Sequence, residues 1–149
     1  TITQQMAKNL FSNAEKTFTR KAKEFIFSLL MERQLGKNRI LELYLNYAQW
    51  GKDVFGCQEA AKKYYNKNCG SLTQRESIEL AAVLANPVKY RPGQRKSKVL
   101  AQRRRIIVEN LYQMNKMSLE TFTKWTGDRP RSVKDSLYKE SIKKIEALP

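Results

Sequence analysis

Apolar residues along this chain recur at intervals of three and four, which is the spacing of one face of an α-helix. Strictly alternating stretches, which would indicate strands, are hard to find, and Gly and Pro number only six and four. The pattern therefore predicts an all-α fold. The expected helices cover residues 1–10, 20–35, 38–46, 57–67, 75–86, 98–114 and 119–125.

Each predicted helix has one apolar face, which we expect to be buried. In the first helix this face holds Ile2, Met6 and Leu10. In the second it holds Ala22, Phe25, Ile26, Leu29 and Leu30. In the third it holds Ile40, Leu41, Tyr44 and Leu45. In the long helix at 98–114 it holds Leu100, Ile107, Leu111 and Met114.

Local signals set the helix boundaries. Gly36 is expected to end the second helix, and Asn38 is able to cap the third. Pro87 ends the fifth helix, because the residue before a proline disfavours the α conformation. An aromatic loop bounded by glycine occupies residues 47–56. A capping box is expected at the start of the fifth helix, formed by Ser71 or Thr73 with Gln74 or Glu76.

The chain is long enough for one domain with a substantial core, since it has 149 residues of which 41% are hydrophobic. We place this domain at residues 1–117. Residues 118–149 are treated as a helical and charged tail, with Gly127 and Pro130 as breakers. No stretch of about 18 apolar residues is present, so an anchor would have to lie upstream of Thr1.

The charge is strongly positive, with 29 Lys and Arg against 14 Asp and Glu, or +15. Such a balance indicates anionic partners, but it does not choose between nucleic acid, anionic lipid and a phosphorylated ligand. A basic block runs from Lys89 to Arg105 without an acidic residue. This block leaves two alternatives open: a basic helical nucleic-acid-binding module, and a peripheral membrane-docking domain without catalysis.

Two cysteines, Cys57 and Cys69, stand twelve residues apart, and the chain has no His. A zinc site is therefore improbable, and the pair is either a disulfide or two free thiols; we expect free thiols. The absence of His also removes the commonest general acid or base. Catalysis near neutral pH would fall to carboxylates, Lys, Tyr or Cys.

The segment "TRKAKEF" places one carboxylate, Glu24, among several cations. The cations of this region are Lys8, Lys16, Arg20, Lys21 and Lys23. One interpretation is an ordinary ion pair with Arg20, four residues before Glu24 on the same helix. The other is a carboxylate held in a cationic pocket, where the cations bind an anion such as a diphosphate.

Five segments now form a series: "TITQQMAKN", "RKAKE", "KNRILELYLNYAQWG", "GCQEAAKKYYNK" and "LTQRESIELAAVLANPVKYRP". In order, spacing and residue identity they resemble the peptidoglycan glycosyltransferases over about residues 1–105, the first four matching motifs two to five. This family includes the monofunctional biosynthetic transglycosylases and the polymerase domains of bifunctional penicillin-binding proteins. The aromatic loop "NYAQWGKDVFG" looks more like the monofunctional branch.

The resemblance implies a lysozyme-like helical fold and an enzyme that works at the outer face of the cytoplasmic membrane, anchored by a segment upstream of Thr1. Enzymes of the family polymerise lipid II into glycan strands for the bacterial cell wall and release undecaprenyl diphosphate. The implied partners are lipid II, the growing glycan chain, the membrane surface and other cell-wall synthases, with no nucleic acid.

The resemblance also assigns site residues. Glu24 matches the catalytic glutamate of the third motif, which lies near the donor diphosphate. The positions associated with the diphosphate or the sugar are Gln4, Gln5, Lys8, Asn9, Lys16, Thr19, Arg20, Lys23 and Arg103. No residue is expected to ligate a metal, and the only cofactor considered is a divalent cation, Mg²⁺ or Mn²⁺, near the diphosphate.

The first motif of the family, with the glutamate proposed as base for the acceptor hydroxyl, has no match downstream of Thr1. We therefore expect an N-terminally truncated domain that binds the donor but does not elongate glycan. Glu32 and Glu42 are interpreted as structural residues and not as replacements for that base.

Overall fold

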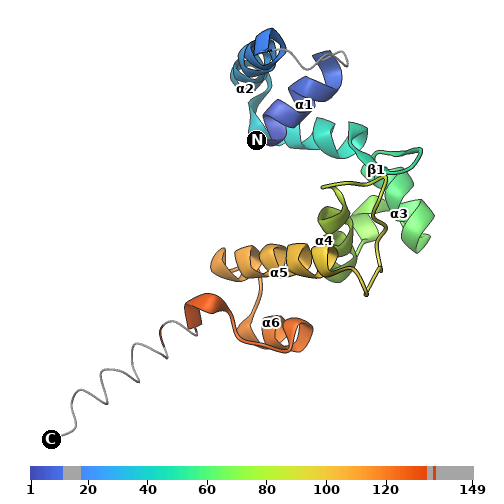
Figure 1. Ribbon diagram of the computed structural model, residues 1–149, viewed down its shortest axis with the longest axis vertical. Coiled ribbons are helices and arrows are strands. Elements are labelled where there is room, and N and C mark those ends of the chain that lie inside the picture. Colours follow the sequence, from blue (N-terminus) through green and yellow to red (C-terminus); the bar gives the residue numbers. More distant parts are fainter. Residues whose placement is uncertain (12–17, 134–135, 137–149) are drawn as a thin grey trace, which may run out of the picture.

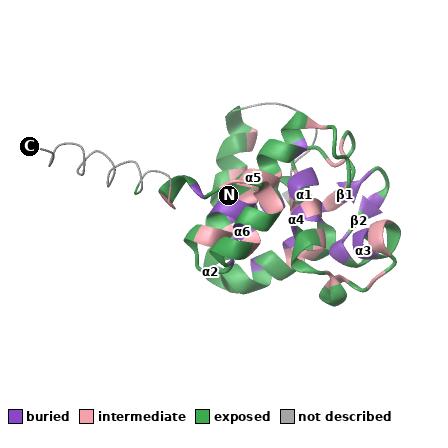
Figure 2. Cartoon of the chain, turned by 90° about the horizontal axis from the view of Figure 1, so that it is seen from below, coloured by how far each residue is buried: buried purple, intermediate pink, exposed green. Residues whose placement is uncertain are grey.

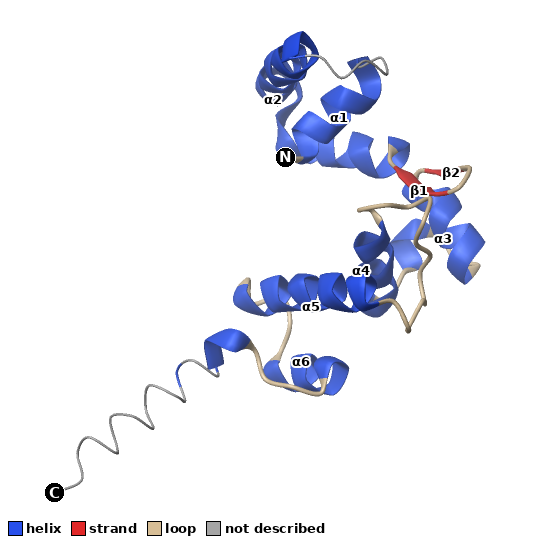
Figure 3. Cartoon of the chain, in the orientation of Figure 1, coloured by secondary structure: helices blue, strands red, loops and turns tan. Residues whose placement is uncertain are grey.

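The computed structural model describes residues 1–11, 18–133 and 136, and confirms a mainly helical protein (Figure 3). Its elements are α1 (Ile2–Phe11), α2 (Phe18–Tyr47), β1 (Gln49–Gly51), β2 (Val54–Phe55), α3 (Cys57–Tyr65), a 3₁₀ turn (Cys69–Ser71), α4 (Gln74–Val83), α5 (Lys98–Gln113) and α6 (Leu119–Thr126). They form an elongated arrangement, with α1 and α2 at one end and α5 and α6 at the other (Figure 1).

Helix α2 consists of two helical segments that meet at Gly36, where φ is 69° and ψ is 161°. The predicted stop at this glycine is confirmed, because a positive φ is readily adopted by Gly and rarely by residues with a side chain. The chain changes direction there, so that the two segments run at an angle to each other (Figure 1).

The predicted aromatic loop contains a small antiparallel hairpin of β1 and β2. Strands of three and two residues are too short to produce an alternating pattern, which is why the sequence did not reveal them. Gly56 closes the hairpin with φ of 81°. A Cβ atom at this position would lie 2.6 Å from the carbonyl oxygen of Asn46, so the close approach requires glycine.

Side-chain caps fix the starts of α4, α5 and α6. Thr73 and Glu76 form the predicted capping box of α4, while Ser97 caps α5 and Ser118 caps α6. The Glu76 carboxylate also pairs with Lys67 at 2.8 Å. The hydrogen bond from Lys67, and then the bond from the Thr73 backbone, lower the pKa of Glu76 to about 2.

Buried residues lie in α1, in the hairpin and in α3 (Figure 2). The largest cluster of the core joins α1, α2, the hairpin, α3 and α4, and includes Met6, Ile40, Tyr44, Trp50 and Leu80. Another joins α4, α5 and α6 around the fully buried Phe122. The short helix predicted at Leu119–Trp125 is thereby confirmed and packs on α5, whereas the domain boundary at residue 117 stays a prediction.

Several burial predictions are wrong. The expected stripe of α2 is exposed: Phe25, Ile26, Leu29 and Leu30 have between 50% and 55% of their surface accessible. In its place Ser28 and Met31 are buried, because α1 covers the opposite side of the helix. Leu41 and Met114 are exposed as well.

Helix α1 also buries a different face from the one predicted. Ile2 and Leu10 are exposed, whereas Thr3, Met6 and Ala7 are buried against α2. Thr3 can be buried because its hydroxyl donates a hydrogen bond of 2.7 Å to Glu32 of α2.

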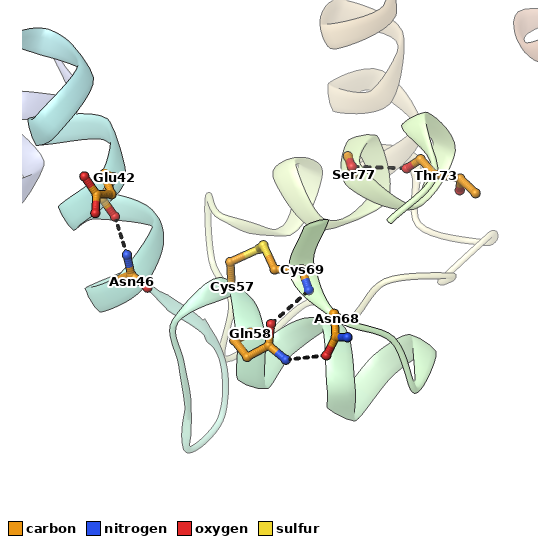
Figure 4. The surroundings of a disulfide bond; sticks show 8 residues. All are labelled: Glu42, Asn46, Cys57, Gln58, Asn68, Cys69, Thr73 and Ser77. Atoms are coloured by element: carbon orange, nitrogen blue, oxygen red, sulfur yellow. Dashed lines mark hydrogen bonds between the residues drawn. A yellow bond between two sulfur atoms is a disulfide. The ribbon is translucent and has the colours of Figure 1, made fainter. Parts of the chain in front are cut away.

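Cys57 and Cys69 form a disulfide, so the prediction of free thiols is wrong (Figure 4). Cys57 begins α3, and Cys69 begins the 3₁₀ turn that folds back over the start of that helix. The Gln58 side chain holds this return by accepting a hydrogen bond from the Cys69 backbone at 3.0 Å and donating one to Asn68 at 2.9 Å. The Cα atoms of the two cysteines are thus 5.7 Å apart, within disulfide range.

Candidate functional site

A cavity of about 680 Å³ lies between α1, the second segment of α2 with the start of β1, the residues that follow α4, and α5. It brings together four of the predicted site residues, namely Gln5, Lys8, Asn9 and Arg103. The first three lie on one side of α1, because Lys8 and Asn9 follow Gln5 by three and four residues. Arg103 reaches the same cavity from α5, which is almost a hundred residues later in the chain.

Tyr44 forms part of the wall of this cavity. Its hydroxyl donates a hydrogen bond of 3.0 Å to the side-chain oxygen of Gln5. Burial raises the pKa of Tyr44, which keeps the phenol neutral and able to donate. The bond fixes the Gln5 side chain with its amide nitrogen still available as a donor.

The polar groups of the cavity suit an anion. Lys8 and Arg103 supply positive charge, while Gln5, Asn9 and Gln49 supply amide groups, and no carboxylate is among the described lining residues. Guanidinium and ammonium groups together with amide donors bind phosphate oxygens well.

This donor set does not fit a protein-bound divalent cation, because Mg²⁺ and Mn²⁺ sites are usually built with carboxylate ligands. Over residues 1–11, 18–133 and 136 the structure contains no group of three or more His, Cys, Asp or Glu placed to hold a metal. The residues present therefore do not support the divalent cation considered from the resemblance as a protein-bound cofactor.

Glu24 is not a lining residue of the cavity. It lies on the first segment of α2 and forms an ion pair with Arg20, with only 14% of its side chain exposed. The ion pair of the first interpretation is present, with Glu24 partly buried beside the cation. The second interpretation, a cationic pocket that binds an anion, stays a prediction.

The other predicted site residues are distributed around α1 and α2. Thr19 and Lys23 are exposed near the start of α2. Gln4 is exposed at the start of α1, where its backbone amide donates a hydrogen bond to the Thr1 hydroxyl at 3.2 Å. Lys16 lies outside the described residues.

Sequence reasoning assigned Tyr44 to the core and did not identify Gln49 or Pro87 as part of the site. Tyr44 is buried, as predicted, but its polar end reaches the cavity. A tyrosine on an apolar helix face needs a partner for its hydroxyl, and that requirement was the available signal. Gln49 and Pro87 carried no comparable signal, because their positions depend on the hairpin and on the turn after α4.

Comparison with known proteins shows to which family this chain belongs. A sequence model of the family described as Transglycosylase matches residues 1–112. The chain belongs to the transglycosylase family. The similarity read from its motifs is thereby confirmed, as is the lysozyme-like helical fold class that it implied.

Curated relatives of this transglycosylase chain carry the name biosynthetic peptidoglycan transglycosylase. The one from Alcanivorax borkumensis is 48% identical over 90 residues, which cover 60% of this chain and 37% of the relative. Those from Paraburkholderia phytofirmans and Bordetella avium are 43% and 41% identical over 111 residues, covering 74% of this chain and 46% of each relative. The chain thus spans less than half the length of these relatives.

Proposed function

We propose that this protein acts in the polymerisation of lipid II into glycan strands, with release of undecaprenyl diphosphate. The observation that carries the proposal is the convergence of Lys8 and Arg103 on one amide-lined cavity in a transglycosylase chain. A lipid-linked sugar diphosphate offers the negative charge and the oxygen acceptors that this cavity suits.

In the proposed reaction the 4-hydroxyl of lipid II attacks C1 of the growing chain. A C–O bond forms at C1, the bond from C1 to the diphosphate oxygen breaks, and the diphosphate departs with the electron pair. Lys8 and Arg103 stabilise the charge on this leaving group, and Gln5 and Asn9 donate hydrogen bonds to it. The proton of the attacking hydroxyl is taken by a base, which in the family belongs to the first motif.

Glu24 acts on the donor side in this proposal. Its carboxylate pairs with Arg20, a predicted diphosphate ligand on the same helix turn. The pair orients the guanidinium, and the negative charge beside the sugar stabilises positive charge that develops at C1 as the leaving group departs.

A position at the membrane surface on the outer side also belongs to the proposal. The first segment of α2 exposes Phe25, Ile26, Leu29 and Leu30 next to the cations Lys21 and Lys23, a combination that suits a lipid interface. The disulfide supports an oxidising compartment. No helix among the described residues is both long and apolar enough to cross a bilayer.

Binding of lipid II in neutral detergent micelles tests the donor site directly. The 149-residue chain is expected to bind, and Lys8→Gln and Arg103→Gln are each expected to weaken binding by about tenfold, a typical value for one charge-assisted hydrogen bond. Lys62→Gln, which removes an exposed cation on α3, is the matched control. Equal binding by all four proteins would contradict the proposed site.

A further inference from the structure

The segment that joins α4 to α5 carries a dense group of exposed cations. We call residues 84–98 the basic connector. Its exposed cations are Lys89, Arg91, Arg95, Lys96 and Lys98. The sequence contains no acidic residue between Glu79 and Glu109, and none of these five cations forms a salt bridge with a carboxylate in the described part of the chain.

The backbone of the basic connector is nevertheless fixed at several points. Asn86 accepts a hydrogen bond from the Lys89 amide at 3.1 Å through its side chain, and one from the Tyr90 amide at 3.0 Å through its backbone carbonyl. Glu79 accepts from the Gly93 amide at 3.2 Å while it pairs with Arg104 at 2.9 Å. The cations therefore project from a loop of defined shape, which lowers the entropy cost of binding an extended charged surface.

The basic connector adjoins the candidate site. Ala85 and Pro87, in its first residues, line the same cavity as Lys8 and Asn9. A membrane that presents the lipid-linked donor to this cavity must therefore lie close to the basic connector.

We propose that the basic connector is a docking surface for anionic phospholipid headgroups. The inference rests on the proposed function, because a lipid-borne donor brings the cavity to the membrane surface. Each Lys or Arg near an anionic leaflet adds to binding, and several exposed cations act together. Val88, which directly precedes Lys89 and has 61% of its surface exposed, suits the boundary of headgroups and acyl chains.

Nucleic acid is the competing polyanion, and the structure favours lipid over single-stranded nucleic acid. Binding of single strands uses exposed aromatic rings on which bases stack. The only aromatic residue of the basic connector, Tyr90, packs on the cluster of Ala82, Val83 and Leu100, with the Lys89 ammonium 5.7 Å from its ring. Its ring is therefore not presented as a stacking surface.

The test is sedimentation of the 149-residue chain with vesicles of phosphatidylcholine alone and of phosphatidylcholine mixed equally with phosphatidylglycerol. The variant carries Lys89→Gln, Arg91→Gln, Arg95→Gln and Lys96→Gln. The matched control also loses four exposed cations, through Lys52→Gln, Lys62→Gln, Lys116→Gln and Lys124→Gln on other elements.

The parent chain is expected to bind the phosphatidylglycerol vesicles, and the connector variant to bind them about twentyfold or more weakly at about 0.1 M salt. The fold loss of vesicle binding in the control variant should be less than a third of the loss in the connector variant. Equal losses in the two variants would show only a net-charge effect and would overturn the proposal. The proposal would also be overturned if the connector variant bound the vesicles as the parent does. The same holds if the variant lost only binding to a short DNA duplex measured in parallel.

Binding of lipid II in neutral detergent separates this inference from the proposed function. The connector variant is expected to bind lipid II there as the parent does, because the four substituted residues do not line the cavity. Loss of vesicle binding with intact lipid II binding supports the docking surface. Failure of the parent itself to bind lipid II would contradict the proposed function, while the vesicle comparison would still decide the role of the connector.

Discussion

The hydroxyl of Tyr44 lies 3.0 Å from the side-chain oxygen of Gln5, joining the second segment of α2 to α1 at the wall of the candidate cavity. Tyr44→Phe removes this bond and leaves the Gln5 side chain able to rotate. We expect lipid II binding to weaken by about fivefold to tenfold, corresponding to about 1 kcal/mol. Tyr47→Phe, at an exposed neighbouring position, is the control and should bind as the parent does. Equal effects of the two variants would contradict a role for the bond.

A second link between the same helices is the hydrogen bond from Thr3 to Glu32, which is 2.7 Å long. Thr3→Val keeps the shape of this buried side chain and removes the donor. The free energy of unfolding in urea should fall by about 1–2 kcal/mol, whereas Thr3→Ser should keep the bond and lose less. If Thr3→Val were as stable as the parent, the bond would not contribute to the packing of α1.

Glu24→Gln removes the charge of the α2 carboxylate while keeping its size. We expect the rate of glycan polymerisation to fall by about 100-fold or more, measured in a longer protein that carries the first motif ahead of Thr1. Binding of lipid II should change much less, because Glu24 does not line the cavity. Rates within a few-fold of the parent would remove Glu24 from the proposed reaction.

The capping box of α4 predicts a pH dependence of stability. The pKa of Glu76 is about 2 in the folded protein, below its ordinary value of 4.5. The carboxylate therefore stabilises the fold above about pH 4.5, and this contribution is lost as the pH falls towards 2. The midpoint of thermal unfolding should decline over this window in the parent and less steeply in Glu76→Gln. Glu120→Gln, on α6, should keep the steep decline.

The disulfide should contribute to stability by restricting the unfolded chain. It closes a loop with a sequence separation of twelve residues, for which about 3 kcal/mol is typical. The double variant Cys57→Ser and Cys69→Ser should lose this amount in urea unfolding, and a reducing agent should destabilise the parent but not the double variant. An identical response of both proteins to the reducing agent would exclude the disulfide in solution.

Most helix positions, the capping box of α4 and the family could be predicted from sequence patterns. The helix expected at 75–86 nevertheless ends at Val83, three residues before its predicted end. The capping box at Thr73 and the glycine at position 36 act over a few residues, and the ordered motifs identify the family without a structure. Burial could not be predicted so well. Phe25 and Leu29 have the periodicity of a core stripe, but the side of a helix that is covered depends on its neighbours, and here α1 covers Ser28 and Met31.

The same limit applies to the site and to the cysteines. The resemblance supplied Gln5, Lys8, Asn9 and Arg103 one by one, but only the fold shows that they share a cavity. The state of Cys57 and Cys69 depends on how the chain returns over α3 after Tyr65, and a spacing of twelve residues does not specify that return.

Gly36 stands between the two segments of α2, and each segment carries a different residue of the proposed site. Glu24 lies twelve residues before the glycine, which is about 18 Å along a helix at 1.5 Å per residue. Tyr44 lies on the other segment, at the cavity. A rotation of about 10° at this one residue would move the Glu24 end of the helix by about 3 Å, as a lever of that length requires. The position of the Glu24 carboxylate relative to a bound donor therefore depends on the φ and ψ angles of Gly36.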